Sequence, residues 1–235
     1  MEIGDGTGWG KYEFFVFLST TMFVNSLIQA FFMPNAQEFS EMIRTGGLDF
    51  ALLKPIDTQF LISTQKVAWS SLANTVVGIA LLLFSVRKLT STPTAAITGE
   101  PLQLTWWSVS LYPFYVFCGV MILYGVMISL SATSIWLGRN QSLYNFWFYI
   151  TNFSRYPMEI YNGAFGTPLK NFFTFIVPVL VVVNVPARIL ARPLCASGPG
   201  AWRLPVFAVV ATIVSLVASR WVFVKALGSY RSASS

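Results

Sequence analysis

Five apolar segments, whose central parts contain no Asp, Glu or His, constrain the fold of this chain more than any other feature. A helix needs about 20 apolar residues to cross the hydrocarbon core of a bilayer. We predict spans at residues 14–33, 67–86, 112–137, 171–189 and 204–224. Because backbone polar groups must be paired inside lipid, the predicted fold class is all-α. The expected architecture is one polytopic membrane helix bundle covering residues 1–235.

The composition agrees with a membrane protein. Hydrophobic residues make up 55% of the chain and charged residues only 10%, whereas soluble domains carry about 25% charged residues. The net charge of +6 comes from fifteen Lys and Arg scattered through short loops. That pattern is typical of interfacial anchors and topology signals rather than of nucleic-acid binding. We therefore expect the lipid bilayer, and not nucleic acid, as a binding partner.

The polar inventory excludes several kinds of chemistry. The chain has no histidine, and its nine acids lie at segment ends or in loops, which disfavours a proton- or sodium-coupled transporter. Two cysteines cannot build a metal site of about four ligands, so we predict no metal, no cofactor and no catalytic residue. An intramembrane enzyme would depend on a Ser–Lys pair, with Lys66 between Ser63 and Ser70, but snorkelling explains Lys66 more simply. A non-transporting membrane scaffold or assembly factor is a further alternative.

Polar residues and prolines mark three places within or between the spans. Asn25 and Gln29 lie four residues apart on one helix face, so they are candidates for lining a pathway or for hydrogen bonding between helices. Pro178 and Pro186 predict a kink or break in the span at 171–189. Residues 140–154 are uncharged but too short to cross, and they predict an interfacial or re-entrant helix.

The distribution of basic residues predicts the topology. Five spans place the termini on opposite faces of the membrane. With the N-terminus outside, nine Lys and Arg lie in inner regions and six in outer ones. Basic residues are enriched on the cytoplasmic side. The C-terminus is therefore predicted to be cytoplasmic.

The segment between the first two spans has the pattern of an amphipathic helix. Asn35 with Glu38 three residues later predicts a capping box, and Phe39, Met42 and Ile43 share one face. Gly46 and Gly47 predict the C-cap. We expect a short helix at residues 36–45 on the inner membrane surface. It is either a plain interfacial anchor or a lever that docks a soluble partner.

Three motifs, in the same order along the chain, resemble a known family. Residues 43–55 (IRTGGLDFALLKP) resemble the G-x-L-D…L-L-[KR]-P signature of a bacterial subgroup of ABC-2 type transporter permeases. Residues 155–161 (RYPMEIY) resemble its Y-P-x-x-I-Y motif, and residues 228–234 (GSYRSAS) its C-terminal Y-x-S-x-S end. The prolines of the span at 171–189 also match a helix of this family. The resemblance covers nearly the whole chain.

This resemblance implies a permease subunit of an ATP-binding-cassette exporter in the bacterial cytoplasmic (inner) membrane. Such permeases pair as homo- or heterodimers, and separate ABC ATPase subunits dock on a cytoplasmic coupling region. ATP hydrolysis is expected in those partners, because this chain has no phosphate loop. The region implied here is residues 36–55. Its candidate contacts are Glu38, Glu41, Arg44, Gly47, Asp49, Lys54 and Pro55.

The resemblance also predicts one departure from the family. ABC-2 permeases usually have six membrane helices, and the segment at 14–33 resembles the second of them. The first family helix is therefore expected to be absent from this chain.

Overall fold

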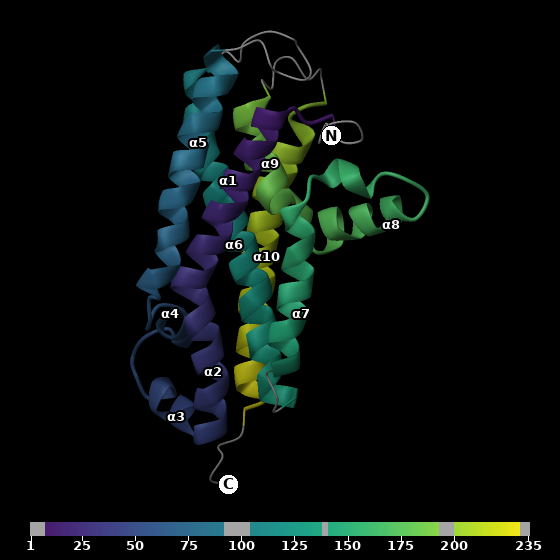
Figure 1. Cartoon of the computed structure of the whole chain (residues 1–235). Helices are drawn as coiled ribbons and strands as arrows, with labels where there is room; N and C mark the ends of the chain where they lie inside the picture. The colour runs from purple at the N-terminus through teal and green to yellow at the C-terminus, as the bar shows by residue number, and fades with distance from the viewer. Residues whose placement is uncertain (1–7, 92–103, 138–140, 193–199, 231–235) are drawn as a thin grey trace.

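Every secondary-structure element in the described part of the chain is a helix. The computed structural model describes residues 8–91, 104–137, 141–192 and 200–230, and all elements within them are helices. Figure 1 shows the long helices upright and side by side, with the N-terminus at one end of the bundle. The C-terminus and helices α2 and α3 lie at the other end. The predicted all-α fold class is confirmed.

The first span and the amphipathic segment form one helix. Helix α1 (Lys11–Leu27) passes through a π-helical turn, η1 (Ile28–Phe32), into α2 (Met33–Thr45), giving a continuous helix of 35 residues. The capping box predicted at Asn35 is wrong, because Asn35 lies inside α2. Helix α2 continues the direction of α1 instead of lying across the end of the bundle (Figure 1). The predicted end is confirmed, since Gly46 has a left-handed backbone with φ of 74°.

Among the described residues, three further helices are long and apolar enough to cross a membrane. They are Trp69–Ser91, made of the 3-10 turn η2 (Trp69–Leu72) and α5 (Ala73–Ser91), then α6 (Trp106–Leu137) and α10 (Arg203–Gly228). The second span is shifted from its predicted range of 67–86 because residues 64–68 are not helical. The third begins six residues before its predicted start at 112.

The span predicted at 171–189 is not one straight helix. Helix α8 (Gly166–Asn171) continues into the π-helical η5 (Phe172–Ile176), and α9 (Val179–Ala191) follows at an angle of 86°. The break falls at Pro178, as predicted, whereas Pro186 lies inside α9 without ending it.

Helix α7 (Gln141–Asn152), followed by the 3-10 turn η3 (Phe153–Arg155), runs upright beside α6 (Figure 1). The interfacial or re-entrant placement predicted for residues 140–154 stays a prediction, and residue 140 lies outside the described ranges. Trp147 and Ile150 are buried. Their packing against the bundle explains why a segment too short to cross a bilayer still stands upright.

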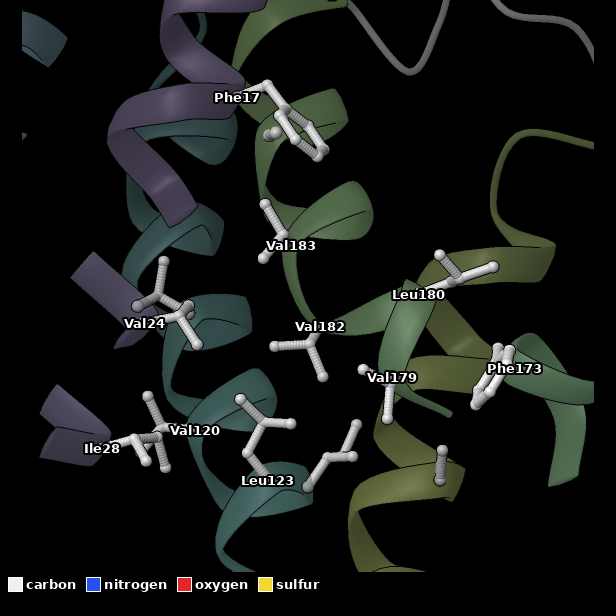
Figure 2. Packing of buried hydrophobic residues seen from close by; sticks show 14 of the residues in the cluster. Phe17, Val24, Ile28, Val120, Leu123, Phe173, Val179, Leu180, Val182 and Val183 are labelled. Atoms are coloured by element: carbon white, nitrogen blue, oxygen red, sulfur yellow. The ribbon is translucent and has the colours of Figure 1, made fainter. Parts of the chain in front are cut away.

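Helix α9 forms the centre of the bundle. Val179, Val182 and Val183 pack among residues of α1 and α6, including Val24 and Leu123 (Figure 2). The approach is close: a Cβ on Gly119 of α6 would lie 2.6 Å from the carbonyl oxygen of Val182. Such small-residue contacts let membrane helices gain van der Waals packing, since lipid provides no hydrophobic driving force.

Candidate functional site

The predicted coupling region, residues 36–55, folds together with the next helix into a helical cap at one end of the bundle. It consists of α2, α3 (Gly47–Leu52) and α4 (Thr58–Ser63). Its inner side is apolar: Phe39 and Leu48 are buried, and the Phe39 ring lies 5.7 Å from that of Phe223 on α10. Its outer side is also partly apolar, because Phe50 is 73% and Leu53 81% exposed. The cap is thus anchored from within and presents an apolar surface outward.

The same cap also carries charged side chains, which lie on α2. Arg44 donates to Glu41 at 2.5 Å, and both side chains are mostly exposed. The hydrogen bond from Arg44 holds the pKa of the Glu41 carboxyl below its usual value. Glu38 pairs with Lys66 from the segment before η2. Since residues 64–68 are not helical and Lys66 binds Glu38, the helical Ser–Lys spacing assumed for a catalytic pair does not form.

A second polar group ties α4 to the membrane helices. Asp57 caps α4 by accepting from the Phe60 N–H at 2.9 Å, and Arg220 of α10 pairs with it at 2.5 Å. The Phe60 amide, followed by Arg220, lowers the pKa of Asp57. Ser63 bonds the Tyr124 hydroxyl of α6 at 2.8 Å. Sequence reasoning missed Asp57, although an Asp just before a helical segment is an N-cap signal.

The remaining predicted contacts lie around the same cap. Gly47 opens α3, and Lys54 and Pro55 are exposed in the turn after it. Asp49 lies near Tyr230: burial, then the Asp49 charge, raises the pKa of that tyrosine. The structure therefore brings all seven predicted contact residues to one end of the molecule.

The two predicted pathway residues lie elsewhere. Asn25 is half-buried on α1, and Gln29 is exposed in the π-helical turn η1. Neither lines the groove of about 760 Å³ bounded by α6, α7, η5 and α10. They also do not line the groove of about 460 Å³ between α1 and α6. Both grooves have largely apolar walls, with phenylalanines prominent among the lining residues.

Buried charges gather at the opposite end of the bundle. Glu13, in the first turn of α1, is 1% exposed, and it accepts from Arg192 at 3.2 Å and from the Gly10 N–H at 3.2 Å. The Arg192 guanidinium also donates to the Gly8 carbonyl at 2.5 Å and lies 4.4 Å from the Trp9 ring centre. This ion pair joins the start of α1 to the end of α9.

A second pair adjoins it through Trp9. The Trp9 indole donates to Glu159 at 3.0 Å, and Glu159 also pairs with Arg188 of α9. Glu159 lies in the 3-10 turn η4 (Met158–Tyr161), whose Met158 N–H donates to the buried Asn184 side chain at 3.0 Å. Sequence reasoning missed this cluster. The available signal was the spacing of Asn184, Arg188 and Arg192 at every fourth position of an otherwise apolar helix.

In the part of the chain that the structure describes, four long apolar helices, a bent helix pair and a charged helical cap are typical of a multi-pass membrane protein. The family model described as ABC-2 family transporter protein matches residues 2–234. The chain therefore belongs to the ABC-2 transporter family, whose members are the membrane permease components of ABC systems and associate with ABC ATPase components. No curated protein and no solved structure gives a significant match.

Proposed function

We propose that this permease forms the pathway of an ABC exporter and that the cap built by residues 36–55 docks its ATPase subunit. The observation that carries the proposal is the pairing of exposed apolar and charged groups on the cap. Phe50 on α3 and Leu53 just after it are exposed, and Glu41 and Arg44 are exposed on α2, which packs against α3. Interfaces combine apolar anchors with a polar rim. Large exposed apolar patches mark interaction sites.

Motion of a docked ATPase has a direct route to the membrane helices. Helix α2 is continuous with α1, and Arg220 of α10 is paired with Asp57 at the start of α4. ATP-driven displacement of the cap would therefore move at least two helices together. Such coupling requires the ATPase to bind the permease conformations with different affinity.

The orientation and assembly follow from the same assignment. The C-terminus of the chain lies at the same end as the cap (Figure 1), so a cytoplasmic cap makes the C-terminus cytoplasmic too. The membrane would be the inner membrane of a bacterial cell. In a single copy Gln29 is exposed and Asn25 is half-buried. Because polar side chains are costly against lipid, we propose that a second permease, identical or related, covers this face and that the two residues line the pathway between the copies.

Co-purification tests the docking proposal. We expect the gene for this chain to neighbour that of an ABC ATPase, and the two proteins would be expressed together in a bacterial membrane. Leu53→Asp and Phe50→Asp should release the ATPase, because each places a carboxylate inside the apolar contact. Trp106→Asp is the matched control, since Trp106 is 86% exposed and begins α6 at the opposite end.

Retention of the ATPase by both cap variants would overturn the assignment of residues 36–55. Loss of the ATPase in the Trp106→Asp control as well would point to a general defect of the membrane subunit. A scaffold without transport activity, the main alternative, predicts no permease-dependent change in the ATPase rate in proteoliposomes.

A further inference from the structure

The junction between α1 and α2 is bonded to the segment that leads into α5. Pro34 has no N–H, so the Ala30 carbonyl, four residues earlier, loses its usual partner within the helix. The Ala68 N–H donates to this carbonyl at 2.8 Å. The backbone group freed by the proline is thus used to hold the start of the next membrane helix.

Asn35 makes a second and more complete connection at the same place. Its side-chain oxygen accepts from the Lys66 N–H at 2.8 Å, and its amide nitrogen donates to the Lys66 carbonyl at 2.8 Å. The same nitrogen donates to the Phe31 carbonyl at 2.6 Å. Asn35 is only 1% exposed. One buried amide therefore satisfies both backbone groups of Lys66 and one carbonyl of the π-helical turn.

Few other side chains can replace this amide. The site needs an acceptor toward one N–H and two donors toward two carbonyls, which is the inventory of a single Asn amide. Asp would place a carboxylate oxygen against both carbonyls, and Leu would leave three backbone groups without the partner that Asn35 provides. The nearby Glu38–Lys66 ion pair is different, because both side chains are substantially exposed.

The connection makes one mechanical unit of α2, α1 and the start of α5. Further along, Ser26 of α1 bonds the Ser71 carbonyl at 2.6 Å and the Thr75 hydroxyl at 2.7 Å. We propose that Asn35 is the positioning residue that passes a displacement of α2 to α5. This inference rests on the proposed docking of an ATPase on the α2–α4 cap, and it adds the specific residue through which the second helix is driven.

Two measurements on the permease–ATPase complex test the proposal. Spin labels are attached to cysteines introduced at exposed Gln37 of α2 and Val77 of α5, and they report the distance between the two helices. The background variant is Cys195→Ser, and Cys118 can stay because it is buried. Independently, a cysteine at exposed Thr90, at the far end of α5, reports nucleotide-dependent changes through its labelling rate. The variants are Asn35→Asp and Asn35→Leu, and the control is Lys66→Gln, which removes only the exposed ion pair.

We expect one narrow Gln37–Val77 distance in the unchanged protein and in Lys66→Gln, with or without ATP. Asn35→Asp should broaden this distance and abolish the ATP-dependent change in Thr90 labelling while the ATPase stays bound. A purely structural role would lower thermal stability without selectively removing the nucleotide response in the folded complex. An unchanged distance and an unchanged response in both Asn35 variants would overturn the proposal.

The two proposals fail in distinguishable ways. If the ATPase does not bind the unchanged permease, docking on the cap fails. The Gln37–Val77 distance measured without nucleotide still decides whether Asn35 holds α2 to α5. If the distribution of that distance stays narrow in Asn35→Asp, Asn35 does not have this role. If the ATPase binds but Thr90 responds to ATP equally in Asn35→Asp, only the positioning role is wrong.

Discussion

The two ends of the bundle hold their charges in opposite ways. At the cap, Glu41 and Arg44 are 55% and 72% exposed, whereas at the far end Glu13 and Arg192 are 1% and 14% exposed. The cap instead derives its cohesion from apolar packing, as in the contact between Phe39 and Phe223. Charges at the cap are accordingly available to a partner. Charges at the far end close the structure on itself by joining α1, η4 and α9.

The largest expected effect is the loss of one partner from the buried pair. Arg192→Ala leaves Glu13 buried beside fewer donors, and breaking a buried ion pair costs about 3–5 kcal/mol. The measurement is thermal and denaturant unfolding in detergent micelles. Arg155→Ala is the control, because Arg155 is an exposed cation that lies over the Phe148 ring.

A double variant sharpens this result. Glu13→Gln combined with Arg192→Gln removes both charges, so it should be less destabilising than Arg192→Ala alone. If Arg192→Ala unfolds no more easily than Arg155→Ala, the far end is not held by charge and the contrast between the ends disappears.

The next effect concerns the buried amide beside this cluster. Asn184 accepts from the Met158 N–H and donates to the Leu180 carbonyl at 2.8 Å. Asn184→Ala leaves the buried Met158 N–H without this acceptor, which costs about 1–3 kcal/mol. Unfolding is measured beside Asn162→Ala, an exposed asparagine that accepts from Lys170. Equal stability of the two variants would show that η4 is not held to α9 by this contact.

A smaller effect is expected at the cap, where Asp57 begins α4. Replacing an N-cap Asp by Ala costs about 0.5–2 kcal/mol. The pKa of Asp57 is lowered in the folded protein, so its contribution is present above the unfolded pKa of about 3.9 and is lost as the pH falls through the folded value. Unfolding of Asp57→Ala and the unchanged protein should therefore differ at neutral pH and converge in acid.

Asp57→Asn separates the two causes of the lowered pKa, because Asn caps helices about as well as Asp but carries no charge. It should be more stable than Asp57→Ala at neutral pH. If Asp57→Asn remains more stable than Asp57→Ala in acid, the stabilisation comes from the uncharged cap. If Asp57→Asn is as unstable as Asp57→Ala at neutral pH, the Arg220 pair rather than the cap supplies the stabilisation.

The regular apolar segments were predictable because lipid permits only helices that pair their own backbone groups. This reasoning located the ends of α5, α6 and α10 to within six residues and predicted the break at Pro178. The sequence-based reasoning failed where residues distant in the sequence form hydrogen bonds with each other. The helix start predicted at Asn35 is wrong because that side chain is used by Lys66, and no local pattern shows this contact.

The two ends also differed in how far they were predictable. The seven residues predicted at the cap lie together because they are near in sequence and surround one glycine turn. The far-end cluster joins Glu13 to Arg192 across 179 positions. Its only local signal, the spacing of Asn184, Arg188 and Arg192, indicates a polar stripe without naming its partners.

The smallest effect on stability is expected for Glu41→Gln. Both Glu41 and Arg44 are exposed, and exposed pairs contribute little because solvent screens them and two side chains must be ordered. The unfolding transition should therefore coincide with that of the unchanged protein. Binding of the ATPase should nevertheless weaken and lose part of its salt dependence, since a charge at the rim of an interface acts mainly on association.

Gln37→Glu is the matched control for that measurement, because it adds a charge to an exposed position of the same helix. If Glu41→Gln destabilises the fold, the charges of the cap act internally like those of the far end. If folding and ATPase binding are both unchanged, the charge of Glu41 has no part in docking. Docking would then depend on the exposed apolar side chains Phe50 and Leu53, which the Leu53→Asp and Phe50→Asp variants test.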